Sequence, residues 1–114
     1  MILFFMKPNN IVKIQTYCPR ADADAVRTAI GEAGGGKMGN YSHCVFVSEG
    51  FGYFMPMEGA NPAIGKTGEI EKVEEVKIEF VCEQDKVKKV VEAIKKAHPY
   101  EEVPIDIFQL MEME

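Results

Sequence analysis

Hydrophobic and polar positions along the chain change their period several times, and each change predicts a different element. Residues 11–17 alternate with period two and precede Pro19, which is typical of a strand that ends there. From Asp22 the apolar residues fall at i, i+3, i+4 and i+7, which is one face of a helix. Residues 34–36 are all glycine and favour a left-handed helix end. We therefore expect a strand followed by a helix that stops at residue 33.

The middle of the chain predicts a hairpin and a long loop. Residues 42–48 and 51–55 are extended runs on either side of a Glu-Gly pair, which favours a tight turn. On the first of these runs, His43 and Cys44 would point to opposite faces of the sheet. Residues 57–68 are rich in glycine and proline and have no period, and a loop of this length in a compact domain is often functional.

The second half of the chain predicts a strand, a helix and a last strand. Residues 71–82 alternate cleanly in their second half and change phase near Glu74, which predicts a bulge or a bend there. A second apolar helical stripe begins at Val87 and ends at His98, because the proline that follows disfavours the α conformation in the residue before it. Residues 103–107 then alternate as the final strand.

The resulting order is strand, helix, strand pair, strand, helix, strand. This order is typical of an α+β, ferredoxin-like fold (βαβ-βαβ), here with an extra hairpin strand, in which both helices cover one face of an antiparallel sheet. All of these elements fit one domain over residues 11–110, a length that can bury one core. We interpret residues 1–10 as an N-terminal extension and residues 111–114 as a frayed tail.

Composition narrows the classes of partner. Of the 114 residues, 46% are hydrophobic and 27% are charged, which is typical of a soluble globular protein. The net charge of −5 provides no positive field for a phosphate backbone, so we expect no nucleic acid partner. Three cysteines without a C-x-x-C pair suit a reducing compartment, which predicts the cytoplasm. No segment approaches the ~20 apolar residues of a spanning helix, so we expect no membrane association.

Four segments together resemble a known domain. They are residues 34–44, 59–65, 71–79 and 97–103, in the same order within a match from about Ile11 to Leu110. They resemble the PII-like or CutA-like domain that is inserted in longer members of the family of NGG-interacting factor three-like proteins and that also occurs as a free-standing small protein. The resemblance implies a PII/CutA-like antiparallel sheet and a regulatory or binding role. It argues against metal-dependent hydrolysis by this chain, because the longer members' metal-binding body is not among these segments.

The predicted ligand site lies at the corner where the second helix ends. The bend at Pro99 presents several polar side chains together, and the 57–68 loop is a candidate wall. The candidate ligand-binding residues are His98, Tyr100, Glu101, Glu102, His43 and Asn40. Imidazole and carboxylate groups suit divalent ions, so His98 and Glu101 are candidate metal ligands. The alternative interpretation is that His98 and Tyr100 fix the corner by hydrogen bonds, with Glu101 in solvent.

Two functions remain open at this point. The first is a small regulatory or ligand-binding module of this family that takes a divalent metal ion, a small molecule or a partner protein. The second is a subunit of, or a remnant from, a metal-dependent, cyclohydrolase-like hydrolase whose site is shared across an oligomer interface. We assign no catalytic residue, because the side chains beside His43 on a strand would point away from it. We do not expect the isolated chain to be an enzyme.

The predicted fold also indicates self-association. Helices on one side leave the other sheet face bare, and bare apolar faces usually find a partner. We therefore expect a homo-oligomer, either a trimer, which the PII/CutA resemblance implies, or a dimer.

Overall fold

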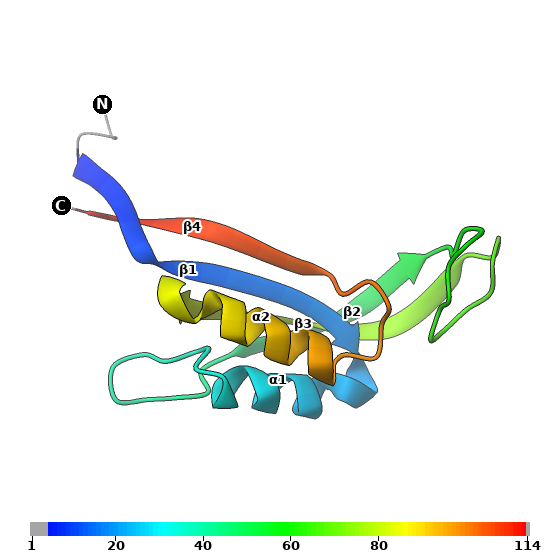
Figure 1. Cartoon of the computed structure of the whole chain (residues 1–114), viewed down its shortest axis with the longest axis horizontal. Coiled ribbons are helices and arrows are strands. Elements are labelled where there is room, and N and C mark those ends of the chain that lie inside the picture. Colours follow the sequence, from blue (N-terminus) through cyan, green and yellow to red (C-terminus); the bar gives the residue numbers. More distant parts are fainter. Residues whose placement is uncertain (1–4, 114) are drawn as a thin grey trace.

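A computed structural model describes residues 5–113 of the chain. Its elements are β1 (Met6–Pro19), α1 (Ala23–Glu32), β2 (Phe46–Phe54), β3 (Glu71–Glu83), α2 (Val87–Ala97) and β4 (Ile105–Met113), with a short 3-10 turn before each helix. The strands form one antiparallel sheet in the order β2-β3-β1-β4. Both helices lie over one face of this sheet (Figure 1). The predicted α+β, ferredoxin-like class is confirmed.

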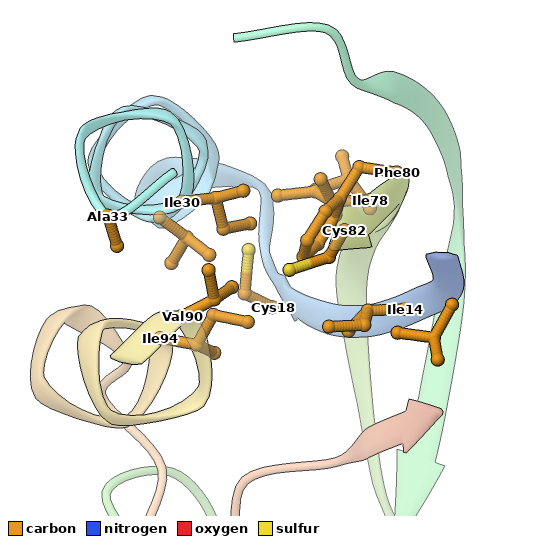
Figure 2. Packing of buried hydrophobic residues seen from close by; sticks show 12 residues of the cluster. Ile14, Cys18, Ile30, Ala33, Ile78, Phe80, Cys82, Val90 and Ile94 are labelled. Atoms are coloured by element: carbon orange, nitrogen blue, oxygen red, sulfur yellow. The ribbon is translucent and has the colours of Figure 1, made fainter. Parts of the chain in front are cut away.

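The core lies between the two helices and the central strands. The register of β1 and β3 pairs Ile14 with Phe80 and Cys18 with Val76, so alternate residues of both strands share the face beneath the helices. Figure 2 shows these side chains meeting those of α1 and α2. The buried apolar residues are Val12, Ile14, Cys18, Val26, Ile30, Ala33, Val76, Ile78, Phe80, Cys82, Val90 and Ile94. The inward positions predicted for β3 are therefore confirmed.

The three cysteines are free thiols. Cys18 and Cys82 are buried in the core. Burial raises the pKa of Cys18 to about 11, with smaller contributions from nearby carboxylates, and burial also raises the pKa of Cys82. Both thiols therefore stay protonated at neutral pH and serve as packing residues.

β2 is one continuous strand, and the predicted hairpin is wrong. Residues 46–54 pair with residues 79–71 of β3 without interruption. Gly50 lies inside the strand and lacks the positive φ that a two-residue hairpin turn would need. The thirteen residues of β3 give every residue of β2 a partner, so the ladder outweighs the local turn preference. Neither ladder of β3 shifts register, so of the bulge or bend predicted near Glu74 the bulge is wrong.

The neighbouring strands β1 and β4 are longer than predicted. Residues 6–8 of β1 pair with residues 111–113 of β4, and a register shift between Pro8 and Val12 marks a bulge. These residues belong to the sheet, although we expected an extension and a frayed tail. Pro8 is tolerated because this part of β1 pairs only with β4, so its nitrogen need not donate to a second ladder. Residues 1–4 and 114 lie outside the described residues.

The sheet face opposite the helices carries a charged cluster between two aromatic side chains. Lys13 and Lys77 of neighbouring strands form ion pairs with Glu79, at N···O distances of 3.0 and 3.6 Å. The hydrogen bond from Lys13, supported by both positive charges, holds the pKa of Glu79 below its usual value. The cross-strand partners of Glu79 and Lys13 include Phe46 of β2 and Phe108 of β4, which are 66% and 47% exposed. This face is thus mixed rather than uniformly apolar.

Over residues 5–113, no helix is long and apolar enough to cross a membrane.

Candidate functional site

A cavity of about 540 Å³ lies where the end of β2 and the loop after it meet the connection between α2 and β4. Its walls are mostly apolar. The lining residues are Gly52, Tyr53, Phe54, Met55, Pro56, Met57, Ala60, Pro62, Ala63, Ile64, Glu75, Tyr100, Glu101, Glu102, Val103 and Pro104. The predicted corner residues Tyr100, Glu101 and Glu102 therefore line one cavity together with the predicted loop wall. His98, the histidine of this corner, is buried and is not among the lining residues.

The buried side chain of His98 holds this corner together through hydrogen bonds to the backbone. It caps the C-terminal end of α2 in an extended conformation, with φ −88° and ψ 139°, as the following proline favours. Its Nδ1 accepts the Tyr100 N–H at 3.1 Å, so Nε2 carries the proton and donates to the Tyr17 carbonyl oxygen at 2.6 Å. The side chain is 7% exposed. Both ring nitrogens are used within the protein, which is the structural alternative considered above, and neither has a lone pair left for a metal ion.

Tyr100 connects this corner to β3. Its hydroxyl donates a hydrogen bond to Oε2 of Glu75 at 2.6 Å, and its ring meets Phe54 edge-on, with centroids 5.9 Å apart. Burial, followed by the hydrogen bond and charge of Glu75, raises the pKa of Tyr100 well above its usual value. The phenol therefore stays a neutral hydrogen-bond donor at neutral pH.

Glu75 is a site residue that sequence reasoning missed. Its carboxylate lies across Gly52 of the neighbouring strand, where a Cβ atom would collide with it. The absence of a side chain at Gly52 thus gives the carboxylate its place on the cavity wall. The signal in the sequence was the change in the apolar pattern near Glu74. Up to Glu75 the more buried residues of β3 lie on the face away from the helices, whereas from Val76 onward the buried residues lie beneath the helices.

Glu101 closes one side of the cavity. Both of its carboxylate oxygens accept the backbone N–H of Asn61, at 3.1 and 3.0 Å, which ties the loop after β2 to the corner after α2. Glu101 is therefore not simply in solvent. In the described part of the chain, no three His, Cys, Asp or Glu side chains gather in a way that would hold a metal ion. The metal roles of His98 and Glu101 stay predictions without geometric support.

His43 and Asn40 belong to the loop between α1 and β2, which lies at the opposite end of β2 from the loop that follows this strand (Figure 1). The nine residues of β2 separate the two ends by about 30 Å, so the structure does not bring these two residues to the corner. His43 is in a loop with φ 62°, and its Nδ1 lies 2.9 Å from the Ser42 hydroxyl oxygen. Residues 42–45 of the predicted strand 42–48 are loop, because a residue in the left-handed region interrupts a regular ladder, whereas residues 46–48 belong to β2. The ring packs on Gly31 of α1, where a Cβ would collide with it.

Known proteins resemble this chain in both sequence and fold. No family model matches the sequence. The chain is 49% identical over 96 residues to the GTP cyclohydrolase 1 type 2 homolog of Bacillus subtilis, covering 84% of this chain and 26% of that relative. The solved structure of a Bacillus cereus protein related to NIF3 matches with a TM-score of 0.77 at 42% identity, covering 93% of this chain and 26% of that chain.

More distant structures share the fold over nearly their whole length. CutA of Pyrococcus horikoshii matches with a TM-score of 0.63 at 22% identity, over 87% of this chain and 83% of that chain. The GlnK–ATP complex of Bacillus subtilis matches with a TM-score of 0.59 at 16% identity, over 88% of this chain and 81% of that chain. At these identities the likeness concerns the fold alone.

The chain spans about a quarter of the length of the curated relatives that it matches. What those longer proteins do as a whole is therefore not carried by this match. The sequence identity shows that this chain corresponds to a domain within the longer NIF3-related, or NGG-interacting factor three-like, proteins, and its fold is of the PII/CutA-like type, which confirms the resemblance seen in its motifs.

Proposed function

We propose that this chain is a regulatory module that binds a small molecule in the cavity at the end of β2. The observation that carries the proposal is the cavity itself, whose volume of about 540 Å³ falls within the ~300–1,000 Å³ of small-molecule sites. Such sites combine apolar walls with a few polar groups, and here those groups are Tyr53, Glu75, Tyr100, Glu101 and Glu102. Hydrogen bonds already hold Tyr100 and Glu101 in place, which lowers the ordering cost of binding.

A binding role suits the lining better than catalysis does. The cavity is lined by three carboxylates and two phenols, and none of its described lining residues is a Ser, Cys, His or Lys, so the Ser–His and Cys–His pairs of nucleophilic catalysis are missing from it. The loop after β2 supplies Met57 and Ile64 to the wall and is tied to the corner through Glu101. A ligand in the cavity would therefore contact this loop directly, and a change in the loop would alter the binding of any partner that contacts it.

Amide-resolved NMR with a library of small molecules tests the proposal. We expect at least one compound class to give saturable shifts at the lining residues Gly52, Met57 and Ile64. Signals of Met38 and Tyr41, at the other end of β2, serve as the internal control and are expected to stay in place. The proposal fails if no compound of a chemically broad library gives saturable shifts at the lining residues.

A second candidate function comes from the names of the relatives. They are called GTP cyclohydrolase 1 type 2 homologs, so this chain is alternatively a subunit or remnant of a metal-dependent hydrolase whose site is shared between copies. Turnover of GTP by the pure chain, abolished by a chelator, would favour this candidate over the binding module.

We also propose that the chain forms a homo-oligomer through the sheet face away from the helices. Phe46 and Phe108 are exposed on either side of the charged cluster on this face, and burying both would remove apolar area from water. A trimer would follow the PII/CutA-like fold. We expect light scattering at micromolar concentration to give two or three times the chain mass of 12.8 kDa, and Phe46→Asp to lower it. A monomeric mass for the parent chain would contradict this.

A further inference from the structure

We infer that the cavity selects a small, flat ligand that offers N–H donors to the Glu75 carboxylate, and that it rejects ligands whose inserted end is anionic. The inference rests on the proposed function and specifies its ligand class. It comes from the charge of the lining, from the way Glu75 is held, and from the aromatic and methionine side chains around it.

The charge of the lining excludes anions from the inner wall. Three carboxylates, Glu75, Glu101 and Glu102, line the cavity, and no Lys or Arg does. Like charges repel more strongly at a protein surface than in bulk water, because the effective dielectric constant is lower there, so a phosphate or carboxylate group beside Glu75 is strongly disfavoured. Of the three, Glu101 already accepts a backbone N–H with both oxygens and Glu102 is exposed to solvent, which leaves Glu75 as the half-buried carboxylate with acceptor capacity inside the cavity.

The hydrogen bonding of Glu75 leaves one oxygen for a ligand. The Tyr100 hydroxyl occupies Oε2, whereas Oε1 lies over Gly52 and accepts no hydrogen bond from the described residues. An ionised carboxylate accepts up to about four hydrogen bonds. A carboxylate that is fixed through one oxygen and open at the other is a pre-oriented acceptor, and charge-assisted N–H donors bind such acceptors most strongly.

The walls around Glu75 suit an apolar ring. Phe54 and Tyr100 contribute aromatic rings, and Met55 and Met57 are flexible side chains that adapt to the shape of a ligand. A cation close to these rings gains further from their π faces. Two kinds of molecule supply the required chemistry, namely an aromatic amidine and a nucleobase-like heterocycle with adjacent ring N–H and amino groups.

Calorimetric titration with matched probes tests the inference. Benzamidine and benzoate share an aromatic ring and differ in the sign of their charge. Guanosine represents the nucleobase-like heterocycles and carries no phosphate. We expect benzamidine or guanosine to bind at least tenfold more tightly than benzoate. Glu75→Gln keeps an acceptor for the Tyr100 hydroxyl but removes the charge, and it is expected to weaken the preferred probe at least tenfold.

Two glycines of β2 provide a matched pair of variants. Gly52→Ala keeps every charge but pushes the Glu75 carboxylate aside, so we expect the same loss of binding as in Glu75→Gln. Gly50→Ala makes the same substitution where a Cβ meets open space, and it is expected to bind like the parent chain. Glu74→Gln removes a neighbouring charge from the opposite side of β3 and is likewise expected to leave binding unchanged.

The outcomes separate this inference from the proposed function. Equal or tighter binding of benzoate, or binding of the preferred probe that survives Glu75→Gln, overturns the ligand class. The ligand class is also overturned if a library compound without N–H donors binds in the cavity while neither benzamidine nor guanosine binds. The proposed function would stand in that case. If nothing in the library occupies the cavity, the proposed function and the inference fall together. Should Gly52→Ala unfold, as judged by circular dichroism, the comparison of Glu75→Gln with Glu74→Gln still decides.

Discussion

Replacing His98 with alanine is expected to lower the free energy of unfolding by about 2–3 kcal/mol. The substitution leaves the Tyr17 carbonyl and the Tyr100 N–H without their partner and opens a small hole at a site that is 7% exposed. Urea denaturation followed by circular dichroism measures the change, and an unaltered slope of the transition would show that the folded state keeps its compactness.

His43→Ala is the control for this prediction. His43 is exposed in a loop and takes part in no buried hydrogen bond, so although its ring packs on Gly31, its loss is expected to change the free energy of unfolding by less than about 1 kcal/mol, well below the loss in His98→Ala. A His98→Ala variant that keeps its full stability but loses an affinity for divalent ions present in the parent chain would contradict the structural role. It would restore the interpretation of His98 as a metal ligand.

Gly36→Ala is expected to cost about 3 kcal/mol of stability. Gly36 has φ 76°, and a Cβ there would collide with the Cys44 carbonyl oxygen. The N–H of Gly36 donates to the Val81 carbonyl at 2.8 Å, and its own carbonyl accepts the Cys44 N–H at 2.9 Å. The loop that leads into β2 is therefore anchored to β3 at a point where no side chain fits.

Gly39→Ala separates backbone strain from collision. Gly39 has φ 57°, but a Cβ there meets nothing within 4 Å, so only the left-handed backbone is penalised, by about 1 kcal/mol. Thermal or urea unfolding of both variants measures the difference. Equal losses in the two variants would show that the close approach of Gly36 to Cys44 does not anchor the loop.

The elements that sequence reasoning predicted correctly are those whose burial is periodic. The helical stripes and the alternation around Ile78 show the core because each buried side chain recurs at the period of its element. The Glu-Gly pair at Gly50 was misleading, because its turn preference is local, whereas the ladder that overrides it depends on the length of β3. A short motif does not contain that tertiary information.

In the candidate site, too, the residues marked by a local sequence signal were predicted, and those that depend on tertiary contacts were not. Tyr100 and Glu101 were predicted because Pro99 creates a bend that is visible in the sequence. Glu75 was missed because a charged residue on a strand resembles a solvent-facing position, and its partner Tyr100 is 25 residues away. His43 was placed at the same corner only because nothing in the sequence showed that β2 would hold the two ends apart.

The pairing of Met6 with Met113 has a mechanical consequence. The outer ends of β1 and β4 leave the sheet side by side (Figure 1), so a longer chain that carried this domain would enter and exit at one point. Tension on that chain would pull the two strands apart like a zipper, loading one pair of backbone hydrogen bonds at a time rather than shearing the whole ladder. The bulge between Pro8 and Val12 would yield next, and the strand residues beneath the helices would bear load only afterwards.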